Sequence, residues 1–301
     1  NKIISSTKGP FANRNGFVEV NQVIFGINEY GIIKKEPNTT WKLILKFRTA
    51  PFNFIVYQLA YIGNNQILAA TTDGLYKFNI SNNEFKRIYK DKTNSNFRSI
   101  YNLGGYYLLG TYGGGIAKKN GDSFQVLQLG EKVNSKIVTS LLSDREGNFW
   151  VGTWMGIYKY DNNRFVTFNA EDGLPSNNIL SVYYDINGGQ VLLGTLAGGL
   201  NIIKSGKVLS TTLSSNTVWS IEKESNNSVW LGTTNGPVLF DINLNKYIYP
   251  IAELQNTIVY AIEKSNSGAV YFGTDKGLYK YFGQQLTLLN ARNGLNNENV
   301  R

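Results

Sequence analysis

Two residue types are absent from this 301-residue sequence, which has no cysteine and no histidine. Without cysteine the chain can form neither disulfides nor thiolate sites. Cysteine usage therefore does not indicate whether the protein resides in an oxidising or a reducing compartment. Without histidine it lacks the commonest general base and metal ligand. No nucleophile–base pair and no calcium loop stands out either. We therefore expect no catalytic residue, no metal site and no cofactor.

Long apolar runs are also absent. The sequence has no stretch of about 18 apolar residues, the length that crosses a bilayer. It shows no signal peptide and begins with Asn1 rather than methionine. We therefore expect it to be a piece of a larger protein.

Acidic residues are fewer than basic ones, with 21 Asp and Glu against 30 Lys and Arg, a formal net charge of +9. One interpretation is lysine scattered over a polar surface. The other is attraction to an anionic partner, either an acidic glycan or a nucleic acid. The basic residues form no run and no arginine-rich stripe, so we do not expect nucleic acid as a partner.

A repeat runs through the whole sequence. Its mark is Gly-Thr, preceded by an apolar run and followed a few residues later by another glycine. Five copies are clear and two earlier ones are degenerate; their first positions are Gly26, Ala70, Gly110, Gly152, Gly194, Gly232 and Gly273. Seven copies about 40 residues apart predict an all-β, seven-bladed β-propeller with four antiparallel strands in each blade and minimal helix.

We predict a single propeller over residues 1–301. The predicted blades lie near residues 16–48, 55–90, 97–129, 137–168, 179–212, 218–249 and 259–290. Residues 293–300 copy the loop at 172–179, so the tail 291–301 is expected to begin a further repeat or to help close the ring. The glycine of each Gly-Thr is expected to let strands and blades approach closely. Asp144 and Asp185 are interpreted as turn residues on the opposite face.

Two sets of loops share one face in this topology: the hairpins after each Gly-Thr and the crossings between blades. Variable loops on a rigid scaffold are where binding usually occurs. The hairpins contribute Glu29, Asp73, Tyr112, Trp154, Leu196, Asn235 and Asp275. The crossings contribute Arg48, Lys92, Arg98, Lys136 and Arg292. From these we select Trp154, Tyr112, Arg98, Lys136 and Asp275 as candidate ligand-binding residues.

Each candidate has a structural alternative. Trp154 and Tyr112 are candidates for aromatic platforms under a sugar ring or a partner domain, or they pack against the adjacent hairpin. Arg98 and Lys136 are candidates to meet a carboxylate or sulfate, or they are solvated surface charges.

Two segments point to a family. Residues 172–185, Asp-Gly-Leu-Pro-Ser-Asn-Asn-Ile-Leu-Ser-Val-Tyr-Tyr-Asp, and residues 143–153, Ser-Asp-Arg-Glu-Gly-Asn-Phe-Trp-Val-Gly-Thr, resemble the two-component regulator propeller repeat. The resemblance covers roughly residues 50–300. The first repeat departs from it, because Phe25-Gly26-Ile27 lacks the tryptophan and the threonine. WD40 blades normally carry Gly-His, which this chain cannot have.

The resemblance implies the extracytoplasmic, periplasmic sensor region of a bacterial hybrid two-component system, whose parent receptor carries a histidine kinase. Many such regions sense oligosaccharides. The implied partners are an oligosaccharide ligand, an adjacent propeller or immunoglobulin-like domain of the receptor, and a second copy in a homodimer. We thus expect a non-enzymatic sensor. Two alternatives stay open: a carbohydrate-active propeller enzyme, sialidase- or lyase-like, and a purely structural ring that transmits signal.

Overall fold

The structure is a computed structural model. It describes residues 17–28, 31–37, 39–40, 42–46, 56–90, 96–102, 106–120, 123–127, 137–160, 165–211, 213, 216–265 and 267–289.

These residues form seven sheets of four strands each. The strands of blades 1 to 3 are β1 (Phe17–Val20), β2 (Val23–Asn28), β3 (Gly31–Lys35), β4 (Lys42–Lys46); β5 (Val56–Tyr61), β6 (Gln66–Thr71), β7 (Gly74–Asn79), β8 (Glu84–Tyr89); β9 (Phe97–Asn102), β10 (Tyr107–Thr111), β11 (Ile116–Asn120) and β12 (Ser123–Leu127). Those of blades 4 and 5 are β13 (Val138–Ser143), β14 (Phe149–Thr153), β15 (Gly156–Tyr160), β16 (Phe165–Phe168); β17 (Ile179–Asp185), β18 (Gln190–Thr195), β19 (Gly199–Lys204) and β20 (Lys207–Ser210). Those of blades 6 and 7 are β21 (Val218–Lys223), β22 (Ser228–Thr233), β23 (Gly236–Asp241), β24 (Lys246–Ile248); β25 (Val259–Lys264), β26 (Val270–Thr274), β27 (Gly277–Phe282) and β28 (Gln285–Leu289).

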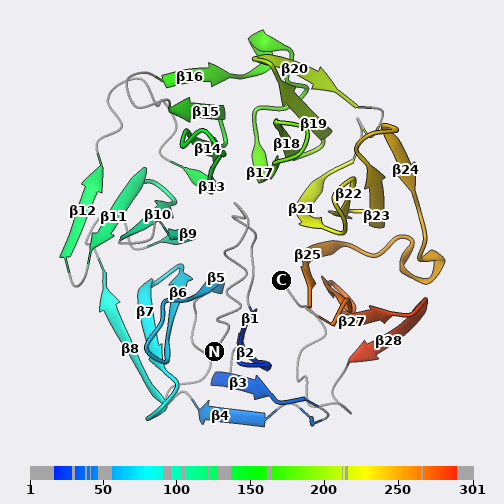
Figure 1. Cartoon of the computed structure of the whole chain (residues 1–301). Helices are drawn as coiled ribbons and strands as arrows, with labels where there is room; N and C mark the ends of the chain where they lie inside the picture. Colours follow the sequence, from blue (N-terminus) through cyan, green and yellow to red (C-terminus); the bar gives the residue numbers. More distant parts are fainter. Residues whose placement is uncertain are drawn as a thin grey trace.

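Each sheet pairs its four strands in chain order, and every pairing is antiparallel. The first strand of each blade lies nearest the centre of the ring and the fourth lies outermost (Figure 1). The only helices in the described residues are two three-residue 3-10 turns, η1 (Ala170–Asp172) and η2 (Ala252–Leu254). The predicted seven-bladed, all-β propeller is confirmed. In the described part of the chain, no helix is long and apolar enough to span a bilayer.

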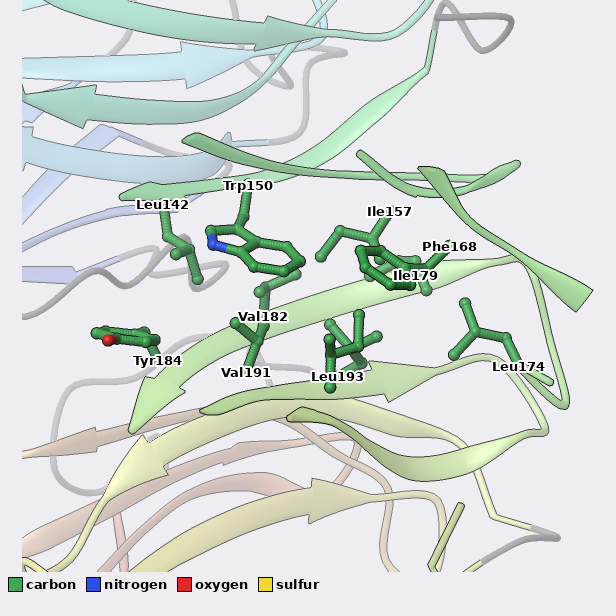
Figure 2. Close-up of a cluster of buried hydrophobic side chains, with 11 residues drawn as sticks. Leu142, Trp150, Ile157, Phe168, Leu174, Ile179, Val182, Tyr184, Val191 and Leu193 are labelled. Atoms are coloured by element: carbon green, nitrogen blue, oxygen red, sulfur yellow. The ribbon is translucent and has the colours of Figure 1, made fainter. Parts of the chain in front are cut away.

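The core lies between neighbouring blades. All seven residues of β17 are buried, because this inner strand is covered on both faces. Between blades 4 and 5, Trp150 and Leu142 pack against Val182 and Val191 (Figure 2). The same alternation serves the third strands: Tyr76 packs toward blade 1, whereas Leu75 joins the cluster shared with blade 3. Side chains of period two thus bind each blade to both its neighbours.

The glycine and the threonine of the Gly-Thr mark have different structural roles. A Cβ on Gly110 would lie 2.3 Å from the Ser99 hydroxyl, and one on Gly152 would lie 2.2 Å from that of Ser140. Glycine is therefore required by the close approach of the inner strand, as predicted. The threonine fixes the hairpin that follows. The Thr153 hydroxyl donates to the Gly156 carbonyl at 2.8 Å and accepts from the Met155 amide at 3.0 Å.

Turns between the first and second strands lie on the other face of the ring. The Asp144 carboxylate accepts from the Asn148 amide at 2.9 Å and from the Trp150 indole at 2.9 Å. Asp185 accepts from the Gly188 amide at 3.0 Å and from Gln190 Nε2 at 2.9 Å. These bonds confirm the interpretation of Asp144 and Asp185 as turn residues.

Candidate functional site

The hairpins after each Gly-Thr and the crossings between blades bond to one another and form one face of the ring, which we name the hairpin face. The Tyr112 amide donates to the Asn96 carbonyl, and the Gly156 amide donates to the Asn177 carbonyl, both at 2.8 Å. Tyr112 also bridges to Ile137 in the crossing that enters blade 4. The loops that vary most in sequence are thereby held together by backbone bonds.

A β-bulge marks the start of the inner strand in blades 2 to 7. There the pairing with the second strand skips one residue, for example between Val56 and Gln58. The skipped residues are Tyr57, Arg98, Thr139, Leu180, Trp219 and Tyr260. Because a bulge leaves its extra residue out of the ladder and re-aims its side chain, these positions can vary without disturbing the sheet. They lie where the inner strands meet the hairpin face.

Four side chains from blades 2, 3 and 4 are in contact on this face, and we name them the aromatic rim: Tyr57, Arg98, Tyr112 and Trp154. The Arg98 guanidinium carbon lies 3.9 Å from the centre of the Tyr57 ring and 4.7 Å from that of Tyr112. The rings of Tyr112 and Trp154 meet edge to face, with centroids 5.7 Å apart and an interplanar angle of 88°. The rim is a continuous series of cation–π and aromatic contacts.

The outer members of the rim keep much of their surface in contact with solvent. Trp154 is 41% exposed and Tyr112 is 37% exposed. Trp154 therefore packs against the neighbouring hairpin, as one of the two sequence interpretations expects, and its ring is partly open to solvent. Met155, the next residue, is 50% exposed.

Arg98 is half-buried and has unusual surroundings. Its Nε atom is buried and has no hydrogen-bond partner among the described residues. No ion pair in the described part of the chain includes Arg98, whereas Arg87 pairs with Asp73 at 2.7 Å and Arg145 pairs with Glu146 at 2.7 Å. Burial lowers the pKa of the Arg98 guanidinium, and the neighbouring Tyr57 and Tyr112 partly offset this effect. Arg98 is thus a half-buried cation that has no carboxylate partner among the described residues.

The structure brings Trp154, Tyr112 and Arg98 together and places Asp275 elsewhere. Asp275 lies in blade 7, which is separated from blade 3 by blades 1 and 2 (Figure 1). Its carboxylate accepts from the Ile258 amide at 2.9 Å and so holds the crossing into that blade. Lys136 lies outside the described residues, as do Glu29, Arg48, Lys92 and Arg292.

The remaining hairpin candidates have other surroundings. Asp73 is bound by Arg87, Lys90 and the Tyr76 hydroxyl. The Asn235 amide donates to the Thr233 hydroxyl at 3.1 Å, a bond within its own hairpin. Leu196 is 40% exposed and is the counterpart of Trp154 in blade 5.

Sequence reasoning missed Tyr57, Trp219 and Tyr260. Trp219 and Tyr260 meet at 5.5 Å with an interplanar angle of 67°, a second aromatic contact between bulge residues of neighbouring blades. A signal was present, since the bulge residue is the second residue of each inner strand. Aligned in that register, these strands begin Val-Tyr, Phe-Arg, Val-Thr, Ile-Leu, Val-Trp and Val-Tyr. The second position varies in character while the first stays apolar.

Comparison with known proteins gives the family of the repeats. Two segments, residues 132–155 and 212–235, match the two component regulator propeller family. The first contains the Asp144 turn and Gly152-Thr153, which carried the resemblance. No curated protein matches the sequence.

Solved structures share the fold. The extracellular domain of the hybrid two-component system BT3049 from B. thetaiotaomicron matches with a TM-score of 0.67 and 20% identity, over 80% of this chain and 36% of that one. That of BT4673 from the same organism matches with a TM-score of 0.66 and 21% identity, over 81% and 34%. PorZ of the type-IX secretion system of Porphyromonas gingivalis matches with 0.64 and 13%, over 94% and 52%.

At these identities the likeness establishes the fold. The chain spans about a third of the length of the two B. thetaiotaomicron domains, 36% and 34%. Two segments of this chain therefore match two-component regulator propeller repeats, and its fold is similar to part of the extracellular domains of hybrid two-component systems.

Proposed function

We propose that this chain is the extracytoplasmic sensor or interaction propeller of a bacterial two-component receptor of the hybrid histidine kinase type, and that it binds a glycan-derived ligand. The aromatic rim is the observation that carries this proposal. It joins two exposed rings to one half-buried cation on the face where variable loops meet. The family of the repeats and the solved extracellular domains support the sensor role.

The chemistry of the rim suits a sugar. A pyranose ring has an apolar face of C–H groups and polar edges, so it stacks on an exposed aromatic face and donates hydrogen bonds around it. Trp154 is a partly exposed aromatic ring of this kind, and its edge-to-face contact with Tyr112 helps to hold the indole in place. A pre-positioned ring loses little entropy on binding, which favours affinity.

Calorimetry with Trp154→Ala tests the proposal. We expect the isolated chain to bind one or more members of a panel of plant and host oligosaccharides, and Trp154→Ala to weaken that binding at least tenfold. Leu196→Ala is the matched control, since Leu196 occupies the same hairpin position in blade 5 and is similarly exposed. Its affinity should stay within twofold of wild type. Equal affinities for both variants would place the ligand elsewhere, and no binding to any member would remove the sensor proposal for this chain.

Two other functions predict different results. A carbohydrate-active enzyme would turn over polysaccharides or chromogenic glycosides, and its activity would disappear when one carboxylate on the hairpin face is replaced. A structural ring would bind no small molecule and would instead contact neighbouring domains of the receptor. Asp144 and Asp185 do not favour the enzyme, since their carboxylates are occupied by turn hydrogen bonds.

A further inference from the structure

The donors of the Arg98 guanidinium indicate which class of ligand binds at the aromatic rim. A guanidinium has five N–H donors in a fixed planar fork. Its central carbon lies over the rings of Tyr57 and Tyr112, and contact with a ring face satisfies none of these donors. The buried Nε is without an acceptor among the described residues. The two terminal NH2 groups supply the other four donors.

Among the described residues, Arg98 has no carboxylate partner that would offset its loss of hydration. Desolvating a cation without a carboxylate partner is unfavourable, because the hydration lost is not replaced by an opposite charge. Other bulge positions avoid this cost, with Leu180 and Thr139 in the equivalent places of blades 5 and 4. The Thr139 hydroxyl donates to two carbonyls, those of Gly152 and Ile179. An unpartnered, stacked arginine at such a position is what an oxyanion site requires before its ligand arrives.

We propose that Arg98 binds the carboxylate or sulfate of an acidic sugar whose ring lies against Trp154. The anion would accept two parallel N–H bonds from the fork of Arg98, and Tyr57 and Tyr112 would hold that fork in plane. The exposed indole of Trp154 lies beyond Tyr112 and supplies the stacking surface that a free inorganic anion would not use. The formal net charge of +9 favours the approach of such a ligand. This inference rests on the proposed glycan-binding function and assigns its ligand class.

The test compares three matched oligosaccharide sets by calorimetry with the same chain. The sets are oligogalacturonides for carboxylates, chondroitin sulfate oligosaccharides for sulfates, and neutral galactose oligosaccharides of equal length. We expect one acidic set to bind at least tenfold more tightly than the neutral set. Arg98→Gln should remove that preference and should also weaken the dependence of affinity on salt, because the paired charge is lost.

Two further variants separate the role of Arg98 from a general charge effect. Arg98→Lys keeps the charge but loses the planar fork, so it should restore only part of the preference. Lys276→Gln removes the same charge from the hairpin of blade 7, where the ammonium bonds to the Asn256 carbonyl and the Thr257 hydroxyl. It should change affinity less than twofold. Thermal melting of each variant checks that the fold is kept.

The outcomes separate this inference from the proposed function. Tight binding of neutral oligosaccharides that depends on Trp154 but not on Arg98 would overturn the acidic ligand and leave glycan sensing intact. Binding of sodium sulfate or acetate alone as tightly as the acidic sugars would reduce Arg98 to a simple anion site and overturn the sugar. No binding by any of the three sets, with folded protein, would overturn the acidic ligand, whereas the proposed function falls only if the wider panel also fails to bind.

Discussion

The contact between blades 4 and 5 and the seam between blades 7 and 1 are built differently. Among the described residues, eleven buried side chains form the cluster between blades 4 and 5, and Figure 2 shows Trp150 and Tyr184 within it. The corresponding cluster at the seam has three, namely Ile33, Leu278 and Leu289. The seam joins the first and last described blades of the chain, and among the described residues its apolar contact is the smaller of the two.

Charge increases this difference. Two acidic side chains, Glu19 of blade 1 and Glu263 of blade 7, lie near each other across the seam. Burial and the Glu19 carboxylate raise the pKa of Glu263. Two basic side chains, Lys35 of blade 1 and Lys280 of blade 7, also lie near each other there. Burial and the Lys280 ammonium lower the pKa of Lys35. Between blades 6 and 7, by contrast, Lys264 pairs with Glu224 at 2.8 Å. Like charges meet at the seam, and opposite charges meet at the neighbouring contact.

The largest expected effect comes from emptying one apolar position in each contact. Ile157 and Leu278 follow the hairpin glycine of blades 4 and 7, so they occupy matched positions. Ile157→Ala should lower the free energy of unfolding by about 4 kcal/mol, and Leu278→Ala by about 2 kcal/mol, since cavity cost grows with how fully the site is enclosed. Urea denaturation followed by far-UV circular dichroism measures both. A larger loss for Leu278→Ala would reverse our ranking of the two contacts.

The second effect concerns the acidic side chains at the seam. The pKa of Glu263 is raised from 4.5 to about 7, so the folded state favours the protonated carboxyl. Its stabilising contribution is complete below pH 4.5 and is lost as the pH rises through 7. Glu263→Gln should therefore match wild type near pH 4 and exceed its stability by about 1–2 kcal/mol at pH 8.

Paired variants give this prediction its control. Glu19→Gln removes the charge that acts on Glu263, so it should give part of the same gain at pH 8, and the double variant should gain less than the sum. Glu253→Gln changes an exposed carboxylate of η2 and should not alter the pH profile. A wild-type profile parallel to that of Glu263→Gln from pH 4 to pH 8 would contradict the like-charge contact.

The fold could be predicted from the sequence because the repeat consists of residues that local packing requires. Gly110 and Gly152 meet the inner-strand serines too closely for any side chain, and the following threonine fixes each hairpin. The close approach of glycine to serine recurs in blades 3 to 6, so its period is visible in the sequence. Blade 1 shows the limit of this signal. It pairs its four strands in order although Phe25-Gly26-Ile27 lacks the threonine, because strand pairing depends on the backbone and the apolar pattern.

Only part of the candidate site could be predicted from the sequence. Trp154, Tyr112 and Arg98 could be chosen because their loops share a face, which follows from the order of strands. Tyr57 was missed, because its role depends on a bulge that moves one residue out of the ladder, and the varying second position of the inner strands was the only trace of that bulge in the sequence. Asp275 was chosen on the same loop argument as Trp154, yet it bonds to its own crossing. Loop position predicts the face, and contacts between blades decide which side chains meet.

The smallest expected effect tests the basic side chains at the seam. Lys35→Gln removes a partly buried ammonium that Lys280 repels, so it should raise the free energy of unfolding by about 0.5 kcal/mol. Lys34 is the matched control, because this adjacent residue points to the other face of β3 and pairs with Glu36 at 2.7 Å. Lys34→Gln should leave stability unchanged or lower it by up to about 0.5 kcal/mol. In 1 M salt, where the Debye length falls to about 3 Å, the gain from Lys35→Gln should shrink. A gain that is equal at low and high salt would mean that burial of the ammonium, and not repulsion across the seam, is the cost that the substitution removes.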